Sequence, residues 1–148
     1  MPSLTLVSGP GGPTCVALVM VSQPREAALK NAGKPVPAPV NGTFLVDTGA
    51  SHTVVDKDLI AALGLVPTGT VLCHTPTTGA TPIPTNQYDV GLFVPGPVSG
   101  AAGWYLPALA VMEHDLAPQG IHGLIGRDAL ASAILIYNGT VGSFTLAY

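Results

Sequence analysis

Phe44-Leu45-Val46-Asp47-Thr48-Gly49-Ala50-Ser51 is the stretch that decides the fold. Its first half has the composition of a buried β-strand, but the strand ends abruptly in a carboxylate, a hydroxyl and a glycine. Asp-Thr-Gly also occurs by chance as a turn in which Asp accepts local backbone hydrogen bonds. The motif gains weight from a second stretch far downstream, Gly123-Leu124-Ile125-Gly126-Arg127-Asp128-Ala129-Leu130.

From about Thr43 to Leu130, the two motifs and their spacing resemble the retropepsin-like aspartic proteases, single-lobe relatives of the retroviral proteases. In that family a strand delivers Asp-Thr/Ser-Gly to the centre of a dimer. An apolar-apolar-Gly segment packs behind it, before a Gly-Arg-Asp/Asn turn opens a helix. The resemblance implies an all-β, single-lobe acid protease fold with one short helix in the C-terminal half and a flap hairpin, closed as a homodimer.

Composition independently favours one β-rich domain spanning residues 1–148. The length allows one core but is too short for two lobes around a cleft. Glycine (18) and proline (15) are scattered between short apolar runs, which favours many short strands joined by turns. Charged residues make up only 9% of the chain, against about 25% in average soluble domains. We therefore expect a partner subunit to cover apolar surface.

Charge and hydropathy exclude several classes of partner. Five Lys and Arg and a net charge of −3 offer no cluster of cations for phosphates, so we expect no nucleic acid. The start has no basic segment followed by an apolar one, and 101–112 is short and interrupted by Pro107, so we expect no membrane insertion and a cytoplasmic chain. Cys15 and Cys73 are expected to be free thiols, with a disulfide as the alternative.

The first half of the chain contains an insertion relative to the retroviral pattern. Strands are expected at 4–7 and 14–21. Retroviral relatives join the following strands by a tight turn, whereas here 22–41 intervenes with three of the five cations. One or two helical turns fit 24–30. We interpret the segment as a solvated loop; a lip of the substrate groove or a partner contact is the alternative.

Two hairpins and a capped helix follow the acid motif. Asp56 is expected to cap a short helix that ends at Gly64. Alternating runs in 70–93 surround a small tip and predict a hairpin, placed like the flap of the family. A hairpin around Asn138-Gly139 is predicted for 133–148 and is a candidate dimer interface.

The resemblance implies a chemistry that one copy of the motif cannot complete. Two carboxylates sharing a proton supply the base that activates water and the acid that protonates the substrate. With a single Asp-Thr-Gly, the second carboxylate must come from another copy, in a twofold dimer. The substrate is then a peptide or protein, the nucleophile is water, and no metal or organic cofactor is needed.

The resemblance also assigns roles to individual residues. The catalytic loop is Asp47, Thr48 and Gly49. Substrate binding falls to Ala50, Ser51 and His52 and to the hairpin tip, Thr77, Thr78, Gly79 and Ala80. Structural support of the site falls to Leu124, Ile125, Gly126, Arg127 and Asp128. Because Ala50 cannot donate a hydrogen bond to the carboxylate, we expect an optimum from mildly acidic to near neutral pH.

Ser51 departs from the retroviral pattern, which commonly has Asp at this position to bind substrate and pair with the Gly-Arg arginine. Arg127 is thereby left without its expected partner. Asp128, Asp56, a carboxylate of the second copy and solvent are the alternatives.

Other interpretations of the sequence are less well supported. The four histidines lack the spacing of a metal site: His52, His74, His114 and His122. A Cys73-His74 nucleophile pair lacks a third orienting group. A phosphate-binding turn of the actin-like ATPase kind would need two larger domains. The main rival is a retropepsin-fold dimerisation or peptide-binding module with weak or no proteolysis.

Overall fold

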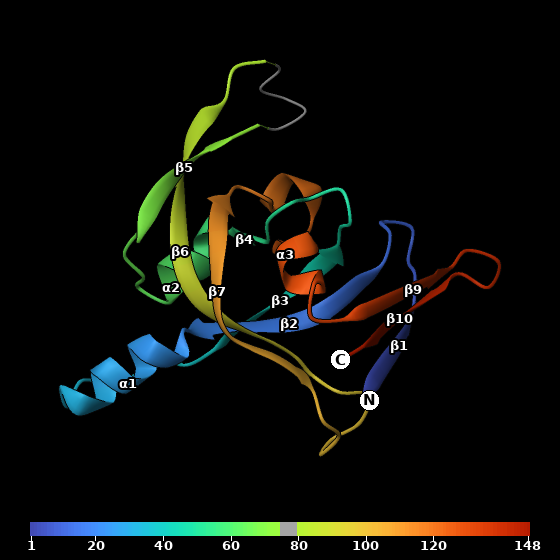
Figure 1. Cartoon of the computed structure of the whole chain (residues 1–148), viewed down its shortest axis with the longest axis horizontal. Coiled ribbons are helices and arrows are strands. Elements are labelled where there is room, and N and C mark those ends of the chain that lie inside the picture. The colour runs from blue at the N-terminus through green and yellow to red at the C-terminus, as the bar shows by residue number, and fades with distance from the viewer. Residues whose placement is uncertain (75–79) are drawn as a thin grey trace.

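The computed structural model describes residues 1–74 and 80–148 (Figure 1). The strands are β1 (Ser3–Val7), β2 (Thr14–Val21), β3 (Val40–Val46), β4 (Val54–Asp56), β5 (Gly69–Cys73), β6 (Ile83–Val94), β7 (Trp104–His114), β8 (Gly123–Ile125), β9 (Ile134–Asn138) and β10 (Ser143–Ala147). The helices are α1 (Gln23–Asn31), α2 (Lys57–Ala62), α3 (Arg127–Leu130) and the 3-10 turn η1 (Ala117–Gln119). The predominantly β architecture expected from the sequence is confirmed.

The larger sheet brings the two sequence motifs together. Its strand order is β2-β3-β8-β4-β7-β6-β5, and an additional pairing of β2 with β6 curls it into a barrel. The short strand β8 lies parallel to β3, with Phe44 opposite Gly123 and Val46 opposite Ile125. On its other side, β8 pairs antiparallel with β4. The acid motif and the Gly-Arg-Asp motif therefore leave neighbouring strands.

The core follows the two-residue period of the strands. In β2, for example, Cys15, Ala17 and Val19 are buried, while Val16 between them is 55% exposed. Phe44 of β3 is completely buried. Burying an aromatic or aliphatic side chain of this size stabilises the fold by about 1.5–3 kcal/mol. The strand that carries Asp47 is thus fixed by the core immediately before the acid.

Within 22–41, where we expected a solvated loop with one or two helical turns at 24–30, Gln23–Asn31 forms α1 and 34–39 is neither helix nor strand. Nine residues are helical, which is longer than the one or two turns predicted, and none of them is buried. Pro24 in the first turn has a suitable φ for a helix start, and the Lys30 ammonium pairs with the Glu26 carboxylate at 2.5 Å, a favourable i,i+4 orientation. Without an apolar face, such a helix gives no periodic signal in the sequence. Figure 1 shows α1 projecting away from the barrel.

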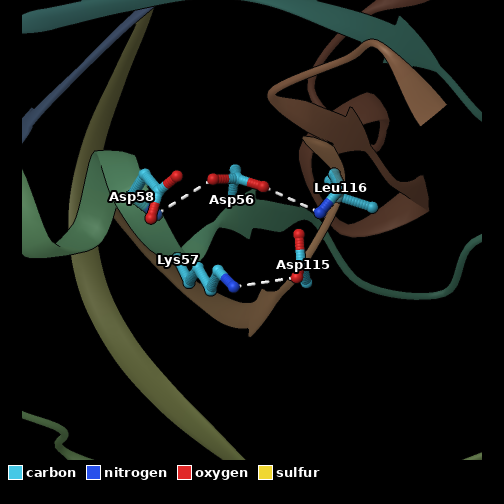
Figure 2. Close-up of polar contacts among 5 residues, drawn as sticks. All are labelled: Asp56, Lys57, Asp58, Asp115 and Leu116. Atoms are coloured by element: carbon cyan, nitrogen blue, oxygen red, sulfur yellow. Dashed lines mark hydrogen bonds and ion pairs between the residues drawn. The ribbon is translucent and has the colours of Figure 1, made fainter. Parts of the chain in front are cut away.

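Asp56 ties α2 to the loop after β7, as Figure 2 shows. The side chain is only 2% exposed, and each oxygen accepts one backbone hydrogen bond. The amide of Asp58 donates to Oδ1 at 2.9 Å, and the amide of Leu116 donates to Oδ2 at 2.7 Å. The predicted helix cap is therefore confirmed. So is the predicted end, since Gly64 has a left-handed φ of 61°.

Replacing Asp56→Ala is expected to destabilise the protein by about 3 kcal/mol. The loss combines a helix cap with a buried Leu116 amide left without an acceptor. Urea unfolding followed by circular dichroism measures it. Asp58→Ala is the matched control, because Asp58 contributes its amide, which remains, and we expect a change within about 0.5 kcal/mol. Equal effects of the two changes would contradict the assignment.

Both predicted hairpins are present. Strands β5 and β6 pair antiparallel from Gly69 opposite Gln87 to Cys73 opposite Ile83. Strands β9 and β10 pair antiparallel within 133–148, and β1 joins them in a second sheet of order β1-β10-β9. Strand β9 is consequently an edge. Hairpin β9–β10 and helix α1 lie at opposite ends of the long axis of the molecule (Figure 1).

The two cysteines are free, as expected, but differ in environment. Cys15 is buried in β2, and burial raises the pKa of its thiol to about 11. Cys73 of β5 is partly exposed. Only the thiolate reacts with alkylating and disulfide reagents. The two thiols should therefore differ in reactivity in the native protein.

We expect a disulfide reagent at pH 8 to modify one thiol quickly, and Cys73→Ser to abolish this fast phase. Cys15 should react only on unfolding or at strongly alkaline pH. Because the pKa of Cys15 is higher in the folded state, its burial contributes fully to stability below the unfolded thiol value of about 8.5. That contribution should fall as the pH rises from there towards about 11. Two fast thiols in the native protein would contradict this assignment.

Candidate active site

Asp47 leaves the end of β3 in a tight, hydrogen-bonded turn. Its amide donates to the carbonyl of Ile125 at 3.0 Å, which fixes the start of the turn to β8. Its Oδ1 accepts from the amide of Gly49 at 2.8 Å, and its carbonyl accepts from the amide of Ala50 at 3.2 Å. Among the described residues, no hydrogen bond engages Oδ2. One carboxylate oxygen is thus anchored and the other is available.

The rest of the loop faces outward. Thr48, Gly49, Ser51 and His52 are exposed, while Asp47 is partly buried. The hydroxyl of Ser51 lies 3.0 Å from Nδ1 of His52. An exposed loop around a partly buried acid leaves room for a substrate or a second copy of the chain.

Arg127 holds loop 47–52 by hydrogen bonds to its backbone carbonyls. Its guanidinium donates to the carbonyl of Thr48 at 2.8 Å and to that of Gly49 at 3.3 Å. Its own amide donates to the carbonyl of Ala50 at 2.9 Å. Within the described chain, Arg127 forms no ion pair with Asp128, one of the expected alternatives. Backbone acceptors have no signature in the sequence, which is why this partner could not be predicted.

A buried network under the loop joins the two motifs. The carboxylate of Asp128 accepts from the amide and the hydroxyl of Thr53, at 2.9 and 2.8 Å. The hydroxyl oxygen of Thr53 accepts in turn from the amide of Gly126 at 3.1 Å. Thr53 is fully buried. We did not predict Thr53 as a site residue; the available signal was a Thr directly before the apolar pair Val54-Val55.

Close packing explains the glycines behind the loop. A Cβ on Gly126 would lie 2.5 Å from the carbonyl carbon and oxygen of His52, and one on Gly123 would lie 2.0 Å from the ring of Phe44. Leu124 lies opposite Leu45 in the β3–β8 ladder. The residues assigned to structural support therefore surround the Asp47 turn.

The remaining predicted residues belong to the tip of hairpin 70–93. Ala80 lies exposed in a turn at the hairpin tip. Thr77, Thr78 and Gly79 lie outside the described residues. Within the described residues, the candidate site is thus loop 47–52 with Thr53 and the start of α3 beneath it.

The other nearby acids are engaged elsewhere. Both oxygens of Asp128 bind Thr53, and Oδ1 also accepts from the amide of Ala129. Both oxygens of Asp56 accept backbone amides. In residues 1–74 and 80–148, no group of three His, Cys, Asp or Glu side chains could hold a metal. No helix in these ranges combines the length and apolar character needed to cross a membrane.

Three comparisons bear on the identity of the fold. A family model described as aspartyl protease matches residues 29–129. No curated protein matches. A solved structure, a retropepsin-like aspartic protease from Rickettsia conorii, matches with a TM-score of 0.59 and 17% identity, covering 99% of this chain and 90% of that chain. The structural match confirms the retropepsin-like fold expected from the sequence.

Proposed function

Because the chain belongs to the aspartyl protease family, we propose that it is an endopeptidase whose active site is shared between two copies. The observation that carries the proposal is the Asp47 turn. It holds one carboxylate oxygen on the Gly49 amide, and the described residues leave the other without a hydrogen bond in a loop that is mostly exposed. The acids Asp56 and Asp128 are occupied by backbone and hydroxyl donors, so a second copy is the source of the second carboxylate.

In the proposed reaction the two Asp47 carboxylates share one proton. The ionised carboxylate takes a proton from water as the water oxygen attacks the scissile carbonyl carbon, and the protonated one gives its proton to the carbonyl oxygen. The resulting diol collapses as the now protonated carboxyl gives its proton to the leaving nitrogen and the other carboxylate takes a proton from one diol hydroxyl. The carbonyl re-forms, the C–N bond breaks, and the two carboxylates again share one proton. Gly49 and Arg127 hold the loop while the charges move.

The proposed dimer brings the two loops together by covering apolar surface. Strand β9 is a sheet edge without a charged residue, and such edges readily pair with another chain. Large side chains of hairpin β9–β10 are 51–67% exposed, namely Ile134, Ile136, Tyr137 and Val141. We assign this surface to the second copy, in keeping with the few charged residues of the chain.

The other predicted roles complete the proposal. Thr48 braces the paired loops, and Ala50, Ser51 and His52 contact the substrate beside the acid. The tip of hairpin 70–93 closes over the bound peptide. With Ala50 unable to donate to the carboxylate, activity should peak from mildly acidic to near neutral pH.

Cleavage of a peptide library, measured over a range of protein concentrations beside analytical sedimentation, tests the proposal. Activity should follow the dimer fraction. Full cleavage by a monomer would overturn the shared site. A stable dimer that cleaves no peptide at any pH would instead identify the chain as a dimerisation or peptide-binding module.

A further inference from the structure

The chain has a second concave site, separate from loop 47–52. A cavity of about 860 Å³ lies between α1, the extended segment after it, the loop after α2, and β6. Four prolines and several aliphatic residues form most of its wall, together with the oppositely charged Arg25 and Asp89. Sites for small ligands typically enclose about 300–1,000 Å³. The cavity is therefore large enough for a few residues of a peptide.

Ser22 lines this cavity, and its hydroxyl forms no hydrogen bond with the described residues. The residue is only 5% exposed and occupies the cap position of α1, but its side chain makes no capping hydrogen bond. In the described part of the chain, the Ser22 hydroxyl has no other hydrogen-bond partner. Every fully buried side-chain nitrogen or oxygen there does have a hydrogen-bond partner. The hydroxyl must therefore reach solvent. Because Ser22 lines the cavity, the cavity is the space that it reaches.

The first turn of α1 adds donors around this hydroxyl. The amides of Gln23 and Arg25 belong to the first turn, where a helix has no internal acceptors, and this end of a helix attracts anions. The side chain of Arg25 lines the same cavity. Glu26, the acid of this turn, is paired with Lys30 and does not line the cavity. A carboxylate would find several donors here.

The distribution of charge points the same way. Segment 22–41 holds three of the five cations of the chain and one acid, Glu26, whereas the rest of the chain holds two cations and seven acids. Segment 22–41 thus carries a net charge of +2 on an otherwise acidic molecule, and of the residues that the structure describes, Asp89 is the one acid that lines the cavity. Such an arrangement attracts acidic partners and repels basic ones.

We infer that the cavity binds a short acidic segment of the protein substrate, away from the bond that is cut. A carboxylate of the segment binds Ser22, Arg25 and the first turn of α1. Its apolar side chains pack on the prolines of the wall, and Asp89 accepts one of its backbone amides. Only the identification of this segment as part of a substrate rests on the proposed function.

The cavity also contacts the root of hairpin 70–93, which favours a substrate as the occupant. Thr68 and Asp89 line it; Thr68 immediately precedes β5, and Asp89 lies on β6. The amide of Thr68 donates to the carbonyl of Gln87 at 2.8 Å and joins the two strands at this point. A segment bound here would hold the substrate beside the hairpin proposed to close over it.

The binding test uses the catalytically impaired Asp47→Asn protein and a short labelled peptide that alternates Glu and Leu. We expect it to bind at least about tenfold more tightly than the same peptide with Gln for Glu. Arg25→Ala should remove most of this preference, and Ser22→Ala should reduce it. Lys34→Ala is the matched control: it removes the same charge from the same segment but does not line the cavity. Its affinity should stay within about twofold.

Equal affinity for the Glu and Gln peptides, or equal losses with Arg25→Ala and Lys34→Ala, would overturn the site. The substrate arm uses the unaltered protein and a cleavable peptide with and without the acidic extension. The extension should lower KM and leave kcat unchanged; an unchanged KM would overturn the assignment to substrate. If no peptide is cleaved, the proposed function fails, and the binding arm still decides whether the cavity takes an acidic segment.

Discussion

Asp47→Asn is expected to lower cleavage by at least about a thousandfold while the dimer and the melting temperature are preserved. The amide oxygen of Asn can still accept from Gly49, so the turn keeps its hydrogen bond. The amide cannot take or give the proton that hydrolysis requires. Steady-state cleavage of a library peptide, beside sedimentation and thermal unfolding, gives the three measurements.

Mixing the two proteins distinguishes a shared site from a complete site in each copy. Suppose that an equal amount of Asp47→Asn protein is added to unaltered protein and the subunits exchange. Randomly paired dimers with both Asp47 residues then fall to about half of their original amount, and activity should fall with them. Unchanged activity after complete exchange would contradict the shared dyad. Retained cleavage by the pure variant would contradict the role of Asp47 itself.

Gly126→Ala is expected to cost about 3 kcal/mol of stability, the upper end of the range for overpacking, and to reduce activity as well. The added Cβ would lie 2.5 Å from the backbone of His52 and 2.8 Å from the amide of Thr53. These are backbone atoms, which cannot rotate away. The segment that follows loop 47–52 must therefore shift. The hydroxyl of Thr53, which accepts from the Gly126 amide, shifts with it. Thermal unfolding should show a midpoint lower by about 10 °C.

Gly69→Ala provides the matched control in strand β5. Among the described residues other than its two chain neighbours, no atom lies within 4 Å of the position of its added Cβ, and its φ is not positive. We expect stability within about 0.5 kcal/mol of the unaltered protein and normal cleavage. If Gly126→Ala were as harmless as this control, the close contact behind the loop would not constrain the site.

Several structural features followed from the sequence because their causes are local. The Asp56 cap, the termination of α2 by the left-handed Gly64 and both hairpins depend on side chains and turn residues within a few positions of each other. The length of helix α1 was underestimated because the helix buries no residue. A helix without an apolar face has no hydrophobic periodicity in its sequence. The partners of Arg127 were not predicted because they are backbone carbonyls. Every residue has a backbone carbonyl, so no residue type in the sequence indicates these contacts.

The sequence by itself determined the acid turn, the alternation of the strands and the family to which the two motifs point. Those features depend on residue types and on the short spacings between them. The tertiary structure alone decided that β8 lies between β3 and β4, so that Thr53 and Asp128, far apart in the chain, share hydrogen bonds beneath Asp47. It also decided that Ser22 and Arg25 face a cavity with Asp89. Such contacts arise from the pairing of distant strands and the packing of segments against them, which no local pattern encodes.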